Sequence, residues 1–275
     1  MKKNVGESMK SINTLMDLQG RVALVTGGAG HIGSATCDAL AETGANIVVI
    51  DCNKELCEAK TRQIIDEFNV EAQSIVMDLT NESELRKIPA RVLKQLHSID
   101  ILVNCAALVG TSSLNGWGVD FKEQNADTWR LALEVNLTVP FILTQVCSDA
   151  LIQSQHGSVI NIGSIYGLLG PDMQIYHGTS MGNPAAYAAS KGGLLQLTRW
   201  LATVLAPEVR VNSISLGGVN RGQPKPFYSR YIEKTPLKRM ASEEDIKGAA
   251  VYLASDLSSY VTGHNLVVDG GYTVW

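Results

Sequence analysis

Seven short apolar runs recur along the sequence, and segments with helical periodicity separate them. Continuous apolar runs of this length are typical of strands buried on both faces, and strands that alternate with helices require a parallel sheet with right-handed crossovers. The sequence therefore predicts an α/β fold, a single doubly wound domain with a seven-stranded parallel sheet and helices on both faces. The runs span residues 21–26, 46–51, 72–78, 100–107, 157–164, 209–215 and 265–269.

Helices are expected in the intervening segments, and a polar leader precedes the first strand. Residues 1–17 contain no hydrophobic stretch, so we expect a loosely ordered leader without a signal peptide, followed by one domain over residues 18–275. One helix should open directly after the first strand. The others are expected at about 54–68, 81–97, 126–153, 185–206 and 243–254.

Composition restricts the class of protein. The 275 residues are 45% hydrophobic with a net charge of -4, and no basic stripe or long uninterrupted apolar run stands out. We therefore expect a soluble cytoplasmic protein without a nucleic acid or a membrane as its partner. The five cysteines and five histidines show no ligand spacing, so no metal site is expected.

A glycine-rich turn follows the first strand. Residues 28–33 fit G-x-G-x-x-G between a predicted strand and a predicted helix, which is the Rossmann context for binding a dinucleotide pyrophosphate. Asp51 ends the second strand, where its carboxylate would accept hydrogen bonds from the adenine ribose and repel a 2′-phosphate. This favours NAD over NADP; the alternative, that Asp51 caps the next helix, fits less well because Asn53 is available for that. Asp78 ends the third strand and would meet the adenine ring or serve as a turn residue.

Tyr187 and Lys191 lie one turn apart on one face of the predicted helix 185–206. A phenol titrates near pH 10, so a base at neutral pH needs its pKa lowered by about 3 units, or about 4 kcal/mol. An ammonium at about 4 Å supplies on the order of 4 kcal/mol in a partly screened site. The spacing thus predicts that Lys191 lowers the pKa of Tyr187, although the same spacing also occurs in plain surface packing.

With these pieces in order, the chain resembles the short-chain dehydrogenase/reductase family over roughly residues 17–275. The resemblance rests on RVALVTGGAGHIG, DILVNCAA, Asn136 within EVNLT, GSVINIGS, YAASK, VRVNSIS and YVTGHNLVVDGGY. The loops are similar to those of members encoded for bacterial surface-glycan or flagellin-sugar synthesis.

The resemblance implies an NAD-dependent oxidoreductase that interconverts an alcohol and a ketone. Tyr187 would be the catalytic acid/base, and Lys191 would lower its pKa and hold the nicotinamide ribose. Ser164 would bind the substrate oxygen, and Asn136 would steady a proton-relaying water, unless it serves only as a structural polar contact. The cofactor-binding residues would be Gly27, Gly28, Gly30, His31, Ile32, Gly33, Asp51, Asp78, Leu79, Asn104, Ala106, Tyr187, Lys191 and Val219.

The sequence departs from the family pattern at four places. His31 replaces a glycine of the common TGxxxGxG turn, and it would either reach the phosphates or face solvent. The strand-four motif reads NCAA rather than NNAG, and Leu216 replaces a proline after the sixth strand. Arg221 stands where a threonine usually meets the nicotinamide amide, so that contact is assigned to Val219.

Two loops should set the substrate. Residues 165–186 form a longer segment than is common in the family, rich in polar and aromatic side chains, and residues 216–240 carry Arg221, Lys225 and Arg230. We expect both to wall the site and to favour a polar, anionic small molecule such as a sugar phosphate or nucleotide sugar. The alternatives are an oligomer contact for the first loop and a solvated charged face for the second.

Two other functions are compatible with these motifs, and the resemblance also implies an assembly. A 3-oxoacyl thioester reductase or a polyol dehydrogenase is the alternative within the family, and a non-catalytic dinucleotide-sensing regulatory protein is the alternative outside it. The resemblance implies a homotetramer, or a homodimer, with contacts through the apolar C-terminus at Trp275 and through the helices at 126–153 and 185–206.

Overall fold

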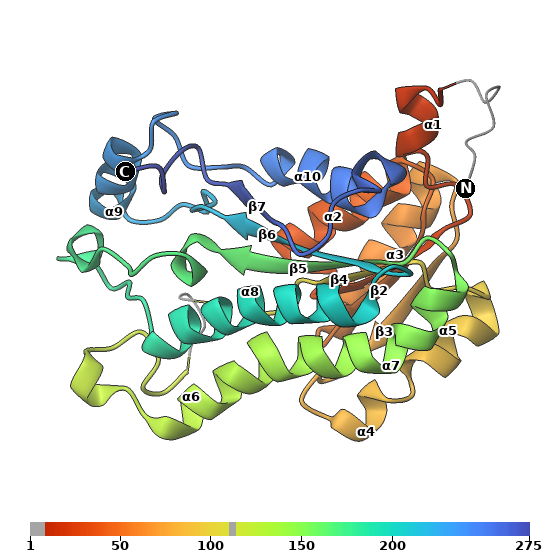
Figure 1. The fold of residues 1–275 in the computed structure, drawn as a ribbon. Coiled ribbons are helices and arrows are strands. Elements are labelled where there is room, and N and C mark those ends of the chain that lie inside the picture. The colour runs from red at the N-terminus through yellow and green to blue at the C-terminus, as the bar shows by residue number, and fades with distance from the viewer. Residues whose placement is uncertain (1–8, 110–113) are drawn as a thin grey trace.

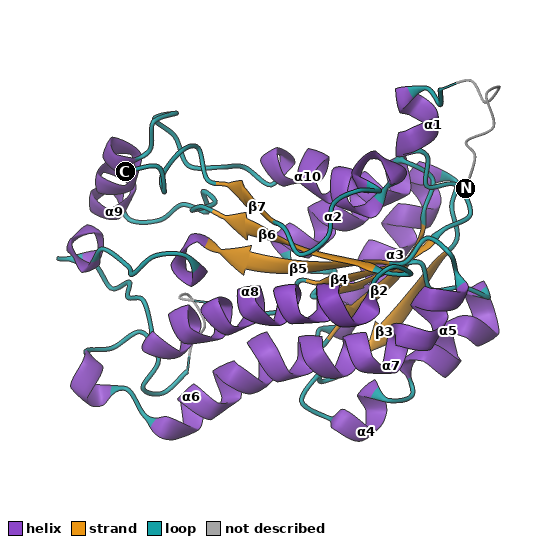
Figure 2. Ribbon diagram, in the orientation of Figure 1, coloured by secondary structure: helices purple, strands orange, loops and turns teal. Residues whose placement is uncertain are grey.

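The computed structural model describes residues 9–109 and 114–275, and a central sheet of seven strands organises it. All strand pairs are parallel, in the order β3-β2-β1-β4-β5-β6-β7 (Figures 1 and 2). The predicted doubly wound α/β fold is therefore confirmed. The strands are β1 (Val22–Thr26), β2 (Asn46–Asp51), β3 (Ala72–Val76), β4 (Ile101–Asn104), β5 (Ser158–Ser164), β6 (Arg210–Leu216) and β7 (Asn265–Val268).

Helices cover both faces of this sheet, and Figure 1 shows the two layers. One layer contains α5, α7 and α8, and the other contains α2, α3 and α10. The helices are α1 (Ile12–Met16), α2 (His31–Glu42), α3 (Lys54–Phe68), α4 (Glu82–Leu85), α5 (Ile88–Leu96), α6 (Ala126–Leu133), α7 (Val139–Gln153), α8 (Ala185–Leu205), α9 (Lys225–Lys234) and α10 (Glu244–Ala254). Short 3-10 turns lie at Phe121–Glu123, Ile165–Gly167, Met173–Tyr176 and Asp256–Ser258.

The sheet forms because its central strands are apolar on both faces. Every residue of β1, β4 and β5 is buried. Successive side chains of a strand point to opposite faces, so Val22 and Leu24 join the core under α5, α7 and α8, whereas Ala23 and Val25 join the core under α2, α3 and α10. Because all strands are parallel, their carboxyl ends lie at one common edge of the sheet. The strand order reverses between β1 and β4.

Three helical segments differ from the sequence predictions. The helix expected at 81–97 is divided into α4 and α5, because Pro89 lies in the first turn of α5 and favours a new helix start. The helix expected at 126–153 contains a π-turn at Glu134–Thr138 between α6 and α7, around the buried Asn136. Helix α9 lies in what the sequence analysis took as a loop.

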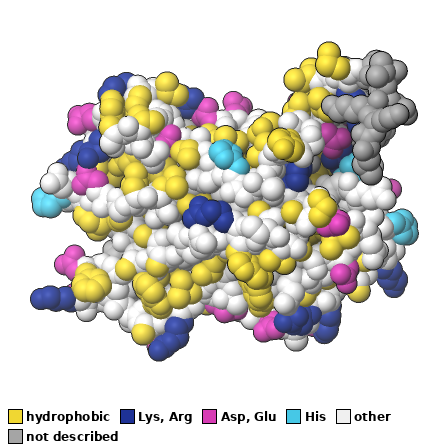
Figure 3. Space-filling model, viewed as in Figure 1, with side chains coloured by type: hydrophobic (Ala, Val, Ile, Leu, Met, Phe, Trp, Pro, Cys, Tyr) yellow, Lys and Arg dark blue, Asp and Glu magenta, His cyan; other side chains and the backbone are white. Residues whose placement is uncertain are grey.

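The run Ala126–Gln153 is long and apolar enough to cross a membrane by length and composition alone. In the fold, α7 instead contributes Ile142, Leu143 and Cys147 to the core against the sheet, as core helices of globular domains do. Its outer face keeps Phe141 and Ile152 partly exposed. Hydrophobic side chains gather over this layer in the space-filling view (Figure 3).

A short helix lies in the expected leader. Ser11 caps α1 by accepting a hydrogen bond from Thr14 N at 3.1 Å, and Leu18, which follows, is fully buried. Residues 1–8 of the leader fall outside the described part of the chain.

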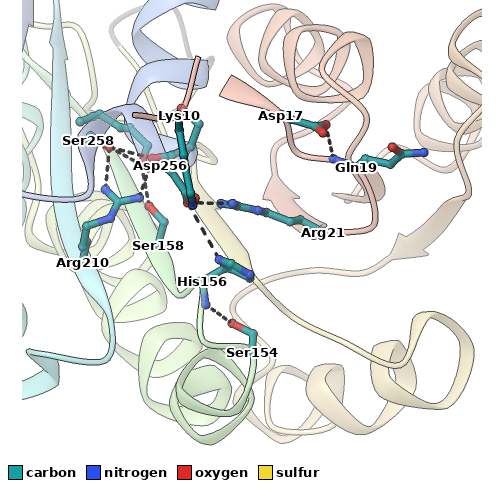
Figure 4. Close-up of polar contacts among 12 residues, drawn as sticks. Lys10, Asp17, Gln19, Arg21, Ser154, His156, Ser158, Arg210, Asp256 and Ser258 are labelled. Atoms are coloured by element: carbon teal, nitrogen blue, oxygen red, sulfur yellow. Dashed lines mark hydrogen bonds and ion pairs between the residues drawn. The ribbon is translucent and has the colours of Figure 1, made fainter. Parts of the chain in front are cut away.

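At the amino end of the strands, a polar cluster ties the first strand to the C-terminal region (Figure 4). Arg21 Nη2 donates to Asp256 Oδ1 at 2.7 Å, and His156 and Lys10 each lie 3.9 Å from the same carboxylate. Nearby, Arg210 Nη1 donates to Ser258 Oγ at 2.7 Å. Burial opposes ionisation of Asp256, but the hydrogen bond and charge of Arg21 outweigh it and lower the pKa of this carboxyl.

Candidate functional site

A cavity of about 250 Å³ opens at the carboxyl edge of the sheet. It brings together Ser164, Tyr187 and Lys191 with Ile32 and Val219, residues that the sequence analysis placed in one site. A larger surface groove of about 1030 Å³ beside α1 shares no residue with this cavity. The cavity is therefore the candidate site, because the predicted reactive side chains converge there.

The glycine-rich turn at one side of the cavity needs its glycines for steric reasons. Gly27 has φ +62°, and a Cβ there would lie 2.9 Å from Ala106 Cα. A Cβ at Gly33 would lie 2.1 Å from Gly27 O, and one at Gly28 would lie 2.9 Å from Val25 O. Gly30 then caps α2 without a side chain, and no acidic residue occupies the first turn of that helix. The N–H groups in the first turn of α2 have no intrahelical acceptor, so this helix N-terminus fits a pyrophosphate.

The end of β4 is held against this turn. Thr26 Oγ1 accepts hydrogen bonds from Cys105 N at 3.0 Å and Ala106 N at 3.1 Å. These bonds keep Ala106 beside Gly27, so the two predicted cofactor-binding segments form one wall. Thr26 is the last residue of β1, and its hydroxyl builds this part of the site.

Asp51 links the second strand to the glycine-rich turn. Its Oδ2 accepts from Ala29 N at 3.2 Å and its Oδ1 accepts from Asn53 N at 3.0 Å. Asn53, not Asp51, caps α3 by accepting from Leu56 N. A carboxylate offers about four acceptor sites, so Asp51 keeps capacity for ribose hydroxyls beside these two bonds.

The other residues assigned to the adenine side follow β3 and β4. Asp78 Oδ1 accepts from Thr80 N at 2.9 Å and from Thr80 Oγ1 at 2.8 Å, so Asp78 acts as a turn residue whatever else it binds. Leu79 is buried. Asn104 Nδ2 donates to Asn161 Oδ1 at 2.8 Å, while Asn104 Oδ1 is buried with no partner among the described residues.

The predicted reactive side chains come from two elements, β5 and α8, that pack side by side. Ser164 ends β5, and Tyr187 and Lys191 lie on the first turns of α8. Lys191 is 3% exposed, and its Nζ donates to Ile162 O at 2.7 Å while lying 5.9 Å from the Tyr187 ring centroid. Tyr187 lines the cavity, where the Ser164 hydroxyl is its hydrogen-bond partner.

The pKa of Tyr187 does not shift in the predicted direction. Burial raises it above the ordinary value of a phenol, and the hydrogen bond of Ser164 offsets only part of this rise. Burial likewise lowers the pKa of Lys191 to about 8. The expectation that Lys191 alone lowers the phenol pKa is corrected, because burial is the largest cause of the shift at both groups and the ammonium bonds to the Ile162 carbonyl oxygen.

Asn136 lies behind the site rather than on its surface. Its Oδ1 accepts from Leu108 N at 2.7 Å, and its Nδ2 donates to Leu108 O and to Ser190 Oγ, both at 3.0 Å. Both amide hydrogens are therefore engaged in holding the segment after β4 against α8. The structural alternative considered for Asn136 accounts for these bonds, and its water-relay role stays a prediction.

The segment 165–186 lines the cavity. Tyr166, Tyr176 and Asn183 contribute a chain of polar groups, in which the Tyr166 and Tyr176 hydroxyls lie 2.8 Å apart and Asn183 Nδ2 donates to Tyr176 Oη at 3.4 Å. Burial raises the pKa of both Tyr166 and Tyr176, so the hydroxyls are neutral. The two tyrosines and Asn183 thus form a neutral, hydrogen-bonding wall beside Ser164.

The segment 216–240 forms the opposite wall, and its three predicted cations have different places. Arg221 lines the cavity, Lys225 is exposed at the start of α9, and Arg230 Nη1 donates to His177 O at 2.5 Å. Lys234 at the end of α9 also pairs with Asp172. Arg230 and Lys234 therefore fasten the first wall to α9, and a joint anion site of the three predicted cations is not formed.

The sequence analysis missed the part of the site that α9 supplies. Phe227 and Tyr231 project from α9 into the cavity wall, and Tyr231 Oη accepts from Gly218 N at 2.5 Å. Cys105 also lines the cavity, where burial raises the pKa of its thiol to about 12. The signal for α9 was present: proline stands beside Lys225, and Phe227 and Tyr231 recur at helical spacing.

Comparison with known proteins places the chain among oxidoreductases. A family profile described as enoyl-(acyl carrier protein) reductase matches residues 27–273. The 3-oxoacyl-(acyl-carrier-protein) reductase of Aquifex aeolicus is 30% identical over 92% of this chain and 98% of its own length. The 2-dehydro-3-deoxy-D-gluconate 5-dehydrogenase of Bacillus subtilis is 32% identical over 96% and 99%. The post-translational flagellin modification protein A of Campylobacter coli is 29% identical over 93% and 99%.

Solved structures give the same answer for the fold. An NAD⁺-bound xylitol dehydrogenase superposes with a TM-score of 0.82, at 31% identity over 92% of this chain and 99% of that one. A gluconate 5-dehydrogenase from Burkholderia cenocepacia in complex with NADP and tartrate superposes with a TM-score of 0.85, at 29% identity over 96% and 100%. Structural neighbours thus include one bound to NAD⁺ and one bound to NADP.

Proposed function

The chain belongs to the short-chain dehydrogenase/reductase family of oxidoreductases, and we propose that it interconverts a secondary alcohol and a ketone with NAD(H), using Tyr187 as the acid/base. The observation that supports this most is the convergence of Ser164, Tyr187 and Lys191 on one cavity beside the glycine-rich turn. Bound nicotinamide would supply the hydride acceptor or donor in this reaction.

The protein's own groups position the substrate and move the proton. The Ser164 hydroxyl, at the end of β5, would donate to the substrate oxygen and keep it beside the phenol. Tyr187 would take the alcohol proton in oxidation and return it in reduction. Burial raises the pKa of Tyr187, which favours the protonated phenol and suits its role as the acid in the reducing direction. Lys191 Nζ donates to Ile162 O at 2.7 Å, and from this position Lys191 would contact the nicotinamide ribose.

NAD is the proposed cofactor because of the charge at the end of β2. Asp51 ends that strand and keeps acceptor capacity beside its bonds to Ala29 N and Asn53 N. A carboxylate there attracts ribose hydroxyls and repels a 2′-phosphate.

A sugar-derived substrate is proposed from the cavity walls. Tyr166, Tyr176 and Asn183 offer neutral hydrogen-bonding groups next to Ser164, as a polyhydroxylated molecule requires. Relatives named for 2-dehydro-3-deoxy-D-gluconate and for galactitol, and the flagellin modification protein, support the same class. The phosphorylated or nucleotide-linked form is the anionic variant of this proposal, and a 3-oxoacyl thioester reductase or a polyol dehydrogenase is its alternative.

The proposed setting is a cytoplasmic homotetramer or homodimer. Trp200 and Val204 on α8 are about half exposed, and Phe141 and Ile152 on α7 are partly exposed on the same layer. The C-terminal Trp275 is 76% exposed, although its Nε1 donates to Lys234 O at 3.0 Å. Apolar surfaces of this kind support subunit contacts, and light scattering of the purified protein tests the assembly.

The decisive test exchanges the phenol. Tyr187→Phe should lower turnover by about 10²- to 10⁴-fold, the range that a positioned acid/base contributes, while NADH binding stays within about twofold. The assay follows formation of NADH with sugar phosphates, nucleotide sugars and polyols as substrates. Tyr260→Phe, at a fully exposed tyrosine, is the matched control and should change nothing. Turnover of Tyr187→Phe at the wild-type rate would show that another group moves the proton.

A further inference from the structure

Two basic side chains share one carboxylate oxygen beside the glycine-rich turn. Arg221 Nε lies 3.6 Å from Glu243 Oε1, and His31 Nδ1 lies 3.5 Å from the same atom. His31 opens α2, Arg221 belongs to the segment after β6, and Glu243 precedes α10. Three segments far apart in the sequence therefore meet at one point at the mouth of the cavity.

That point lies at the N-terminus of α2. Gly30 caps this helix without a side-chain hydrogen bond, and its first turn contains no acidic residue. Free N–H groups and the helix dipole favour an anion there. Arg221 also lines the cavity, together with Ile32 of the first turn of α2 and with the predicted reactive side chains of Ser164, Tyr187 and Lys191.

The backbone holds Arg221 and Glu243 in register. Asn220 N donates to Ala241 O at 2.8 Å, and Ala241 N donates to Gly218 O at 2.9 Å, so the two segments run paired. Arg221 N donates to Gln223 Oε1 at 2.8 Å, which fixes the turn that carries the guanidinium. The backbone that carries Arg221 is therefore fixed beside Glu243, and the ion pair with Glu243 orients the guanidinium.

The guanidinium keeps donors for a ligand. Its recorded ion pair uses Nε, and no hydrogen bond within residues 9–109 and 114–275 engages Nη1 or Nη2. These two nitrogens present the fork that binds two phosphate oxygens at once. Glu243 meanwhile is one third exposed on its side chain and contacts the inner nitrogen only.

We propose that Arg221 binds the pyrophosphate of the dinucleotide, and that Glu243 is a positioning residue that holds the guanidinium over the N-terminus of α2. The inference rests on the proposed function, because it needs a dinucleotide in the cavity. It gives Arg221 a role toward the cofactor phosphates, in place of a contact with the nicotinamide amide or with an anionic group of the substrate.

Calorimetric titration separates these three roles without turnover. NADH and ADP-ribose are titrated into the wild type, Arg221→Met, Arg221→Lys and Glu243→Gln, and circular dichroism melting shows that each variant is folded. ADP-ribose carries the pyrophosphate but no nicotinamide. Lys225→Met is the matched control, since it removes an exposed cation from the same segment.

Arg221→Met should weaken NADH and ADP-ribose alike, by about 10- to 100-fold, which is the range of a charge-assisted hydrogen bond. Arg221→Lys should lose less, because it keeps the charge but not the fork. Glu243→Gln should weaken ADP-ribose severalfold in the wild-type background and have no weakening effect when combined with Arg221→Met, since a positioning residue acts only through the group it positions. Lys225→Met should leave both affinities unchanged.

The contrary results are distinct. A loss of affinity for NADH but not for ADP-ribose would assign Arg221 to the nicotinamide amide. Unchanged affinity for both ligands would exclude a contact with the cofactor and leave the substrate as the partner of Arg221. Each of these two results overturns the inference. Equal losses from Glu243→Gln with and without Arg221 would remove the positioning role. If the wild type binds neither ligand, the proposed function itself fails, and the inference falls with it.

Discussion

Adding one methyl group at Gly33 should separate the glycine-rich turn from α2. The new Cβ would lie 2.1 Å from Gly27 O and 2.7 Å from Gly27 C, and both are backbone atoms that cannot rotate away. Non-bonded carbon atoms prefer about 3.5–4.0 Å, so the turn and the helix must part by on the order of 1 Å. Overpacking of this kind costs about 1–3 kcal/mol of stability, and more where backbone must move.

The same shift moves the proposed phosphate site, because the first turn of α2 and Gly27 would form that site together. Gly33→Ala should therefore lower turnover on the order of 100-fold, as expected for a displacement near 1 Å, and should weaken NADH binding with it. Urea unfolding gives the stability change and calorimetric titration gives the affinity. Gly248→Ala is the control: in α10 its Cβ meets nothing within 4 Å, so it should gain about 0.5–1 kcal/mol in helix propensity. Wild-type stability and NADH affinity in Gly33→Ala would refute the steric argument.

Three further predictions concern the cofactor, the wall and the amino end of the sheet. Asp51→Asn should raise the affinity for NADP relative to that for NAD at least about tenfold, because the repulsion of a 2′-phosphate is lost. An NADP-to-NAD affinity ratio equal to that of the wild type would contradict the role of Asp51 in selecting NAD. Arg230→Ala removes the donor to His177 O and should raise substrate KM with NADH binding unchanged, measured by steady-state kinetics and titration. The fold lowers the pKa of Asp256, so its ionised carboxylate stabilises the folded state. This contribution to the free energy of unfolding is fully present above about pH 4, the pKa in the unfolded chain, and is lost as the pH falls through the folded-state pKa. Asp256→Asn should thus lower the free energy of unfolding by about 1–3 kcal/mol at pH 7, measured by urea unfolding. The difference in stability between variant and wild type should become smaller below about pH 4. A difference that does not depend on pH would exclude ionisation of Asp256 as the cause.

Periodicity was sufficient for the sheet because the central strands β1, β4 and β5 are buried on both faces and read as continuous apolar runs. The seven strands match the expected ranges to within two or three residues, and α3 begins and ends where the spacing predicts. The glycine-rich turn could also be predicted, since most of the close contacts that require its glycines are made within a few residues; Ala106 and Val49 are the distant ones. Local causes were therefore visible in the sequence.

Effects that depend on tertiary contacts were not readable. Desolvation raises the pKa of Tyr187, and its size depends on how the walls close over the phenol. The engagement of Asn136 with Leu108 and Ser190 arises from a π-turn meeting a distant segment. Helix α9 was not predicted because Pro224 and Pro226 are typical of loops. Both prolines stand at or before the first turn of the helix, where proline is tolerated.

The substrate-facing region has a small core of its own. Ile175 and Tyr176 of the first wall pack with Phe227 and Tyr231 of α9 in a cluster distinct from the two cores that hold the sheet. Polar contacts connect the same two segments: Arg230 donates to His177 O, and Lys234 pairs with Asp172. This cluster should therefore be exchanged between relatives as one unit. Replacing both segments together should transfer the substrate preference and leave the dinucleotide-binding part of the fold unchanged. Replacing only one segment should leave its apolar side chains without their packing partners.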